Sequence, residues 1–230
     1  RGRQFNVISD STAADLVKRG VPEKDVSVIH CGIDRKAYSF DPAAFKYGKP
    51  TILYVGRIKK YKSIQHLISA FKIVKEKLPE SRLMIVGTGD YLPNLKSMAH
   101  RFGLDDSVEF PGFVSLENKL ERMRRSHVGV LPSIREGWGL TNIECNAVGT
   151  TVVAADSPGL RDSVKDGVTG LLYPYGDVET LATKLLMILS DEKYRQKLEQ
   201  DALKWAETFD WDIAAKAFEK LIIEIAGKRT

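Results

Sequence analysis

The sequence predicts an α/β fold in which helices surround a doubly wound, Rossmann-like parallel sheet. From Thr51 onward, short runs rich in Val and Ile alternate with amphipathic stretches of about ten to fifteen residues, the pattern of successive strand–helix–strand units. A chain of 230 residues with 43% hydrophobic residues can also bury a substantial core. The expected strands are residues 51–55, 82–86, 107–110, 127–131, 151–155 and 170–172.

Helices are expected between and after these strands. Residues 63–77 begin at Ser63, a residue type that often caps helices, and Pro79 follows their end. Gly103 and Gly149 each follow a helical stretch and are typical helix stops. Later helices are expected at residues 178–189 and 192–208, with a last one ending near 225. In the helix expected at residues 63–77, the apolar positions at helical spacing are Ile64, Leu67, Ile68, Phe71 and Val74.

The two ends of the chain differ from its middle. The first thirty residues predict a strand at 5–8, a helix at 11–19 and a second strand at 26–29. Residues 31–50 have no clear periodicity, which is typical of a linker or an irregular crossover. The last helix carries an apolar stripe that needs a packing partner. The stripe consists of Ile213, Ala217, Leu221 and Ile225.

Composition argues against several classes of protein. The net charge of +5 favours anionic ligands, but no nucleic-acid-binding motif accompanies it, so nucleic acid is not an expected partner. No apolar run approaches the roughly 20 residues of a membrane helix, and no secretory signal is evident, so we expect a cytoplasmic setting. Cys31 and Cys145 lie far apart and the four histidines are scattered, so neither a disulfide nor a metal site is predicted.

In a doubly wound sheet, ligands bind outside the carboxyl ends of the strands, so the loops there are candidate sites. The first such loop, Gly56 to Lys62, leads into a helix whose free N–H groups and dipole favour an anion. Arg57 can engage two phosphate oxygens and Lys62 supplies a point charge, so together they suit a diphosphate. The alternative is a solvated basic turn.

The second loop, residues 136–144, places two carboxylates around a glycine-rich turn. Its glycines allow a close backbone approach, and amides where the next helix begins can meet phosphate or sugar oxygens. Glu144, about one turn into that helix, can accept hydrogen bonds from two ribose hydroxyls, while Glu136 lies nearer the transferred group. Either glutamate alone could be merely a helix-dipole partner. The candidate contacts are Glu136, Gly137, Trp138, Gly139, Leu140, Thr141 and Glu144.

Two further loops follow strands. Residues 86–90 contain a single G-x-G and no complete G-x-G-x-x-G, so we interpret them as a tight turn and do not favour a nicotinamide dehydrogenase. At the end of the next strand, backbone groups of Gly112, Phe113 and Val114 could contact the edge of a base. The alternative there is a core aromatic pair, Phe110 and Phe113, beside a turn.

These motifs together resemble the group 1 retaining glycosyltransferases, which have the GT-B fold. The resemblance rests on Gly56-Arg57-Ile58 with Lys62, and on two glutamates separated by seven residues. It continues through residues 156–160 and 166–172 to Phe209-Asp210-Trp211 before the last helix. It implies that Arg57 and Lys62 bind the donor diphosphate and Glu144 the ribose. It further assigns the donor sugar to Glu136 and the amides after it, and the base to residues 112–114.

The resemblance implies that the chain is the C-terminal, donor-binding half of such an enzyme. Residues 1–35 would then be the tail of an N-terminal domain and a hinge, residues 36–208 the nucleotide-sugar-binding domain, and residues 209–230 a crossover helix. The implied activity, in glycan biosynthesis, is transfer of a hexose from a UDP-, GDP- or ADP-sugar, with retention of configuration. The acceptor would be a glycan or a lipid-linked sugar.

The resemblance also sets expectations for cofactors, partners and location. No cofactor or metal is needed if Arg57 and Lys62 neutralise the diphosphate. This half alone is not expected to transfer sugar, and its last helix could bind the N-terminal domain or self-associate. The full-length protein is expected in the cytoplasm or at the inner membrane surface.

Three departures from the family pattern affect detail. Ser63 stands where the family usually has glycine, Cys31-Gly32 replaces Asn-Gly in the hinge, and Cys145-Asn146 replaces Ala-Met. None removes a charged contact. Two other functions stay open: a nucleotide-sugar epimerase on the GT-B fold, against which the paired glutamates argue, and a binding module without catalysis.

Overall fold

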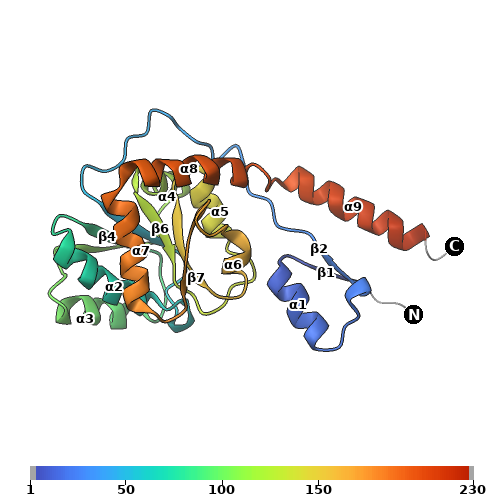
Figure 1. Cartoon of the computed structure of the whole chain (residues 1–230), viewed down its shortest axis with the longest axis horizontal. Coiled ribbons are helices and arrows are strands. Elements are labelled where there is room, and N and C mark those ends of the chain that lie inside the picture. Colours follow the sequence, from blue (N-terminus) through green and yellow to red (C-terminus); the bar gives the residue numbers. More distant parts are fainter. Residues whose placement is uncertain (1–3, 228–230) are drawn as a thin grey trace.

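The computed structural model describes residues 4–227 and contains the expected doubly wound α/β sheet (Figure 1). Six parallel strands lie in the order β5-β4-β3-β6-β7-β8. All six expected strands are confirmed, with ends that shift by at most two residues. They are β3 (Thr51–Val55), β4 (Arg82–Val86), β5 (Val108–Gly112), β6 (Val128–Leu131), β7 (Val152–Asp156) and β8 (Gly170–Pro174).

Helices cover both faces of this sheet. β3 leads to β4 toward one edge, whereas β6 leads to β7 toward the other, so right-handed crossovers place α2 and α5 on opposite faces. α2 and α7 lie side by side on one face, and α8 packs against α5 and α7 (Figure 1). The helices are α2 (Ile64–Lys77), α3 (Leu92–Arg101), α4 (Leu116–Arg125), α5 (Leu140–Ala147), α6 (Leu160–Ser163), α7 (Val178–Ser190) and α8 (Glu192–Ala206).

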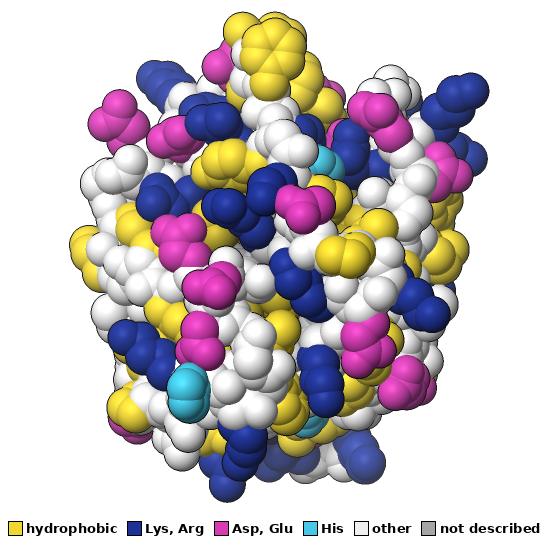
Figure 2. All heavy atoms as spheres, turned by 90° about the vertical axis from the view of Figure 1, so that its left-hand side faces the viewer, with side chains coloured by type: hydrophobic (Ala, Val, Ile, Leu, Met, Phe, Trp, Pro, Cys, Tyr) yellow, Lys and Arg dark blue, Asp and Glu magenta, His cyan; other side chains and the backbone are white. Residues whose placement is uncertain are grey.

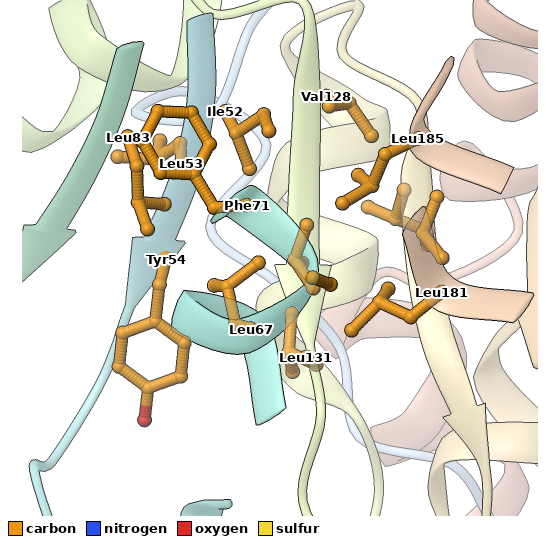
Figure 3. Packing of buried hydrophobic residues seen from close by; sticks show 14 of the residues in the cluster. Ile52, Leu53, Tyr54, Leu67, Phe71, Leu83, Val128, Leu131, Leu181 and Leu185 are labelled. Carbon is orange, nitrogen blue, oxygen red and sulfur yellow. The ribbon is translucent and has the colours of Figure 1, made fainter. Parts of the chain in front are cut away.

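The main core fills the space between the sheet and its helices. In Figure 3, Leu67 and Phe71 of α2 lie between β3 and the α7 residues Leu181 and Leu185. All four side chains are fully buried, and each such side chain contributes about 1.5–3 kcal/mol to stability. This packing fixes the start of α2, and with it the loop that leaves β3.

The first part of the chain forms a small unit of its own, as expected. β1 (Phe5–Val7) and β2 (Val26–Val28) pair in parallel in a separate two-stranded sheet, with α1 (Asp10–Lys18) between them in the chain. Ser11 joins this unit to the larger sheet, because its amide and its hydroxyl both donate to the Asp162 carboxylate at 3.0 Å. The start of α1 is thereby held beside the loop after β7.

Residues 31–50 contain no regular helix or strand, as expected for an irregular crossover. They are nevertheless anchored: Lys46 donates to the Gly149 carbonyl and the Thr150 hydroxyl, both at 3.0 Å. Tyr38 and Tyr47 pack against the main core. This segment is therefore part of the folded domain.

The last helix, α9 (Trp211–Gly227), projects away from the sheet on the side of α1 (Figure 1). None of its residues is buried in the structure that residues 4–227 form. Of the expected stripe, Ile213 and Ala217 are exposed while Leu221 and Ile225 are partly exposed, and what covers the stripe stays a prediction. Its exposed large side chains are Trp211, Ile213, Phe218, Ile222 and Ile223.

The surface near α2 and α3 gives no sign of a single-charge patch. Figure 2 shows this face, on which basic and acidic side chains are interspersed. The excess of basic residues is not concentrated there. Among residues 4–227, no helix has the length and apolar character needed to cross a membrane.

Ser63 precedes α2 but does not cap it, so that expectation was wrong. The chain enters α2 through a 3-10 turn, Lys60–Lys62, which leaves Ser63 in the left-handed region with φ 53° and ψ 32°. Its hydroxyl lies 3.0 Å from the Tyr175 hydroxyl instead. Among residues 4–227, Ser63 alone of the non-glycine residues has positive φ, which gives a physical reason for the family's usual glycine.

We predict that Ser63→Gly is more stable than Ser63→Ala by about 1 kcal/mol, because only glycine adopts this conformation without a Cβ penalty. Ser97, exposed inside α3, is the matched control. There the order should reverse, since alanine is the better helix former by about 1 kcal/mol. Chemical denaturation of the four variants measures both differences, and the same order at both positions would contradict the prediction.

Candidate functional site

The strand order reverses between β3 and β6. Because the chain runs from each of these strands toward opposite edges, the loops after them diverge and leave a crevice at the carboxyl end of the sheet. This crevice has a volume of about 120 Å³. Seven of the residues predicted from the sequence line it: Gly56, Lys62, Glu136, Trp138, Gly139, Leu140 and Thr141.

An ion pair between Lys62 and Glu136 closes one side of the crevice. The Lys62 ammonium donates to the Glu136 carboxylate, and the two side chains are only 13% and 17% exposed. Lys62 also lies 5.1 Å from the centroid of the Tyr61 ring. A partly buried cation that has one carboxylate partner is well placed to share its charge with an anionic ligand.

Arg57 lies in the loop after β3, as Lys62 does, and its side chain is exposed. Its guanidinium donates to the Tyr61 hydroxyl at 3.0 Å, and within residues 4–227 it has no acidic partner. Its carbonyl accepts a hydrogen bond of 2.9 Å from Tyr54, whose burial raises the pKa of the phenol. The loop is therefore anchored through its backbone while the Arg57 side chain stays available to a ligand.

The loop that carries Glu136 is held by the loop after β7. The Glu136 amide donates to the Pro158 carbonyl at 3.0 Å, and the Gly139 amide donates to the Gly159 carbonyl at 3.2 Å. Gly159 has φ of +81°, and a Cβ there would overlap the Glu136 carbonyl oxygen. Only glycine permits this approach, so Gly159 helps to set the position of Glu136.

The buried Trp138 side chain anchors this loop. It is 6% exposed, and its ring stacks on His30 with centroids 4.3 Å apart and lies beside Phe209. The loop is thereby joined to the end of the first unit and to the segment before α9. Gly137, by contrast, is exposed and lines a second cleft beside α1.

Glu144 lies in α5 and does not line the crevice. Its carboxylate lies 2.8 Å from the Lys119 ammonium, which also donates to the Tyr38 hydroxyl at 2.7 Å. Burial lowers the pKa of Lys119, but Glu144 and Tyr38 outweigh it and raise that pKa above its ordinary value. Lys119 is therefore held in its charged form against Glu144.

The segment predicted to contact a base lies at the end of β5. The Gly112 carbonyl accepts from the Gly87 amide at 2.8 Å, while Val114 packs against the core. Phe113 is 85% exposed whereas Phe110 packs against the core, so the alternative of a buried aromatic pair is wrong. A Cβ on Gly87 would overlap the Gly56 carbonyl oxygen, so the G-x-G loop serves close packing of two loops.

Comparison with known proteins agrees with this arrangement. A family model described as "Glycosyl transferases group 1" matches residues 36–205. The chain belongs to this family. It is 32% identical over 225 residues to the D-inositol 3-phosphate glycosyltransferase of Kribbella flavida, covering 90% of this chain and 53% of that protein. It is 29% identical over 206 residues to the glycogen synthase of Mycobacterium tuberculosis, covering 89% and 49%. The chain thus spans about half the length of these curated relatives.

Solved structures agree with the GT-B C-terminal architecture. Anabaena Alr3699/HepE in complex with UDP superposes with a TM-score of 0.89 at 21% identity, covering 96% of this chain and 64% of that one. Sucrose-phosphate synthase from Thermosynechococcus elongatus gives a TM-score of 0.86 at 27% identity, covering 97% and 58%. The six-stranded sheet and its helices therefore have the fold of these glycosyltransferases.

Three polar groups near the predicted site residues were not predicted from the sequence. Ser133 lines the crevice, is 1% exposed, and its hydroxyl has no hydrogen-bond partner within residues 4–227. Its place directly after Pro132 at the end of β6 could have drawn attention to it. Lys119 and Tyr38, the partners of Glu144, come from distant segments, so no local signal pointed to them.

We predict that Gly159→Ala lowers the free energy of unfolding by about 2–5 kcal/mol, the sum of a left-handed backbone penalty and a clash with the Glu136 carbonyl. Gly167→Ala is the matched control. Gly167 has φ of +72°, but a Cβ there would meet no atom within 4 Å, so only about 1–2 kcal/mol should be lost. Urea denaturation measures both variants, and equal losses would show that Gly159 does not constrain the Glu136 loop.

Proposed function

We propose that this chain binds the nucleotide-sugar donor of a retaining hexosyltransferase, and that the full-length protein transfers the hexose to a glycan or a lipid-linked sugar. The observation that carries the proposal is that Lys62 and Glu136 meet in the crevice between the loops after β3 and β6, while Arg57, directly after Gly56 of the crevice wall, lines the adjoining cleft. Two related structures support a nucleotide donor, because Anabaena Alr3699/HepE is solved in complex with UDP and with UDP-glucose.

Lys62 and Arg57 are the groups that would meet the donor diphosphate. As the bond between the hexose and the diphosphate breaks, negative charge grows on the departing phosphate oxygens. Lys62, which is held in the partly dry crevice, would stabilise that charge more than water does, and the exposed Arg57 would add a second positive charge. Within residues 4–227, no cluster of three His, Cys, Asp or Glu side chains could hold a metal ion. We assign neutralisation of the diphosphate to Lys62 and Arg57, because both belong to the loop after β3 that borders the crevice.

Glu136 would lie beside the transferred hexose. Its carboxylate is held by Lys62 on one side and its backbone by the loop after β7 on the other, so its position is fixed before a ligand arrives. Of the amides at the start of α5, that of Thr141 would meet the sugar or phosphate oxygens, because the Gly139 and Leu140 amides already donate to the Gly159 and Trp138 carbonyls. Preorganisation of this kind avoids reorganising the site during the reaction.

The nucleoside would extend beyond the crevice. Ligand sites usually occupy about 300–1,000 Å³, whereas this crevice has about 120 Å³, so only the diphosphate and part of the sugar fit inside. The ribose would reach Glu144, sharing its carboxylate with Lys119. The base would lie along Gly112, Phe113 and Val114, where Phe113 offers an exposed ring.

We predict that titration calorimetry with UDP, GDP and ADP finds one that binds and that Arg57→Ala and Lys62→Ala weaken this binding strongly. Both variants should bind the corresponding nucleoside like the parent, since it lacks the diphosphate charge. Glu144→Gln should weaken both ligands by about 1–3 kcal/mol, or about 5- to 150-fold. Lys59→Ala is the matched control, because Lys59 lies in the same basic loop but pairs with Asp90.

Two outcomes would count against the proposal. If the parent, Arg57→Ala and Lys62→Ala bind the diphosphate equally tightly, the basic loop is an ordinary solvated turn and not a diphosphate site. If none of the three nucleotides binds the parent, the assignment of a donor site in this chain is wrong.

A further inference from the structure

A second, larger cleft adjoins the crevice. It has a volume of about 620 Å³ and lies between α1 and the loops after β3, β6 and β7. Of the residues that line the two spaces, Glu136 alone lines both. A molecule in the cleft and a hexose in the crevice would therefore meet at Glu136. The volume also falls in the range of about 300–1,000 Å³ that is usual for small-molecule sites.

The acidic side chains of this cleft are already neutralised. Asp15 pairs with Arg19 at 2.9 Å, and Glu136 pairs with Lys62. Neither Arg19 nor Lys62 lines the cleft, so the cations that neutralise Asp15 and Glu136 lie outside it.

The basic side chains of the cleft, in contrast, are mostly uncompensated. Lys18 on α1, Arg57 after β3 and Arg135 after β6 all line it, and within residues 4–227 none of them has an acidic partner. Arg161 also lines it but is paired with Asp156 at 2.8 Å. Three cations from three separate elements thus face one space in which no free acid remains, an arrangement that favours an anionic ligand.

Two of these cations are left over once the donor is placed. The proposed function assigns Arg57 to the donor diphosphate, so Lys18 and Arg135 have no role in donor binding. They come from two of the elements that bound the cleft, and Arg135 directly precedes Glu136. Ser11 holds the start of α1 to Asp162, which keeps the helix that carries Lys18 beside these loops.

We propose that this cleft receives the sugar acceptor and that the acceptor carries a phosphate group bound by Lys18 and Arg135. The proposal rests on the proposed function, because it needs the donor in the adjoining crevice. A phosphate monoester carries nearly two negative charges at neutral pH and can accept hydrogen bonds from both side chains at once. A neutral sugar would leave both cations without a counter-charge. Anchoring the phosphate beside Glu136 would hold the rest of the acceptor near the transferred hexose.

Titration calorimetry on the chain saturated with its preferred nucleoside diphosphate tests this proposal, with glucose 6-phosphate and glucose as probes. The bound nucleotide occupies Arg57, so the remaining anion binding reports on the cleft. We expect glucose 6-phosphate to bind at least about tenfold more tightly than glucose, and Lys18→Gln or Arg135→Gln to weaken it about fivefold or more. Lys193→Gln, an exposed lysine on α8, is the control and should bind like the parent.

Vesicles distinguish a soluble phosphate from a lipid-linked one. The chain is mixed with phosphatidylcholine vesicles, with and without phosphatidylinositol 4-phosphate. Binding of glucose 6-phosphate that depends on Lys18 and Arg135 supports a soluble acceptor. Binding only to the phosphoinositide vesicles, lost in both variants but not in Lys193→Gln, supports a lipid-linked one.

The proposal is overturned if neither glucose 6-phosphate nor the phosphoinositide vesicles bind. It is also overturned if glucose binds as tightly as glucose 6-phosphate, or if Lys18→Gln and Arg135→Gln bind the phosphate probes as tightly as the parent. Nucleoside diphosphate binding tells this failure from that of the proposed function. If the chain binds its nucleotide but does not prefer a phosphorylated probe, the donor-site assignment stands and the acceptor assignment is wrong. A chain that binds no nucleotide loses both.

Discussion

Lys62 and Glu136 lie 74 residues apart in the sequence and meet because β3 and β6 are neighbours in the sheet. The pairing of Ile52 with Val128 and of Leu53 with Gly129 sets their register, so both strands end at the same edge. Each loop then carries one member of the ion pair into the crevice. Desolvating two charges costs free energy that the pair itself only partly recovers, so the arrangement suits a site completed by a ligand better than a purely structural contact.

Two further loops keep this pair in place. The loop after β4 packs its Gly87 against the Gly56 carbonyl, and the loop after β7 packs its Gly159 against the Glu136 carbonyl. Neither glycine contacts the crevice, yet a side chain at either position would displace backbone next to a charged residue. The loops after β4 and β7, the strands that flank β3 and β6, therefore act as supports, and the site is preorganised by backbone contacts rather than by side chains alone.

Much of the fold was predictable from the sequence, because buried parallel strands form short continuous apolar runs and the expected strands have one, except for residues 107–110. Lys62 and Glu136 were predictable for a related reason: residues directly after such strands must lie at one edge of the sheet. The neighbours of Ser63 did not predict its conformation, since serine is a common cap, and the family's usual glycine at this position was the one sign of a left-handed backbone. The Lys119–Glu144–Tyr38 contacts were also missed, because they depend on how three distant segments pack. The donor contacts of Arg57, Lys62, Glu136, Glu144 and residues 112–114 all stay predictions.

The switch-point crevice competes with a larger cavity of about 550 Å³ at the opposite, amino end of the strands, lined by Lys49, Arg82 and Ser107 among others. Amide chemical shifts in nuclear magnetic resonance spectra, followed during titration with UDP, GDP and ADP, distinguish the two most directly. We predict that the nucleotide that binds shifts the amides of residues 56–63 and 136–141 most strongly. Shifts confined to Lys49, Arg82 and Ser107, with the two loops unchanged, would contradict it.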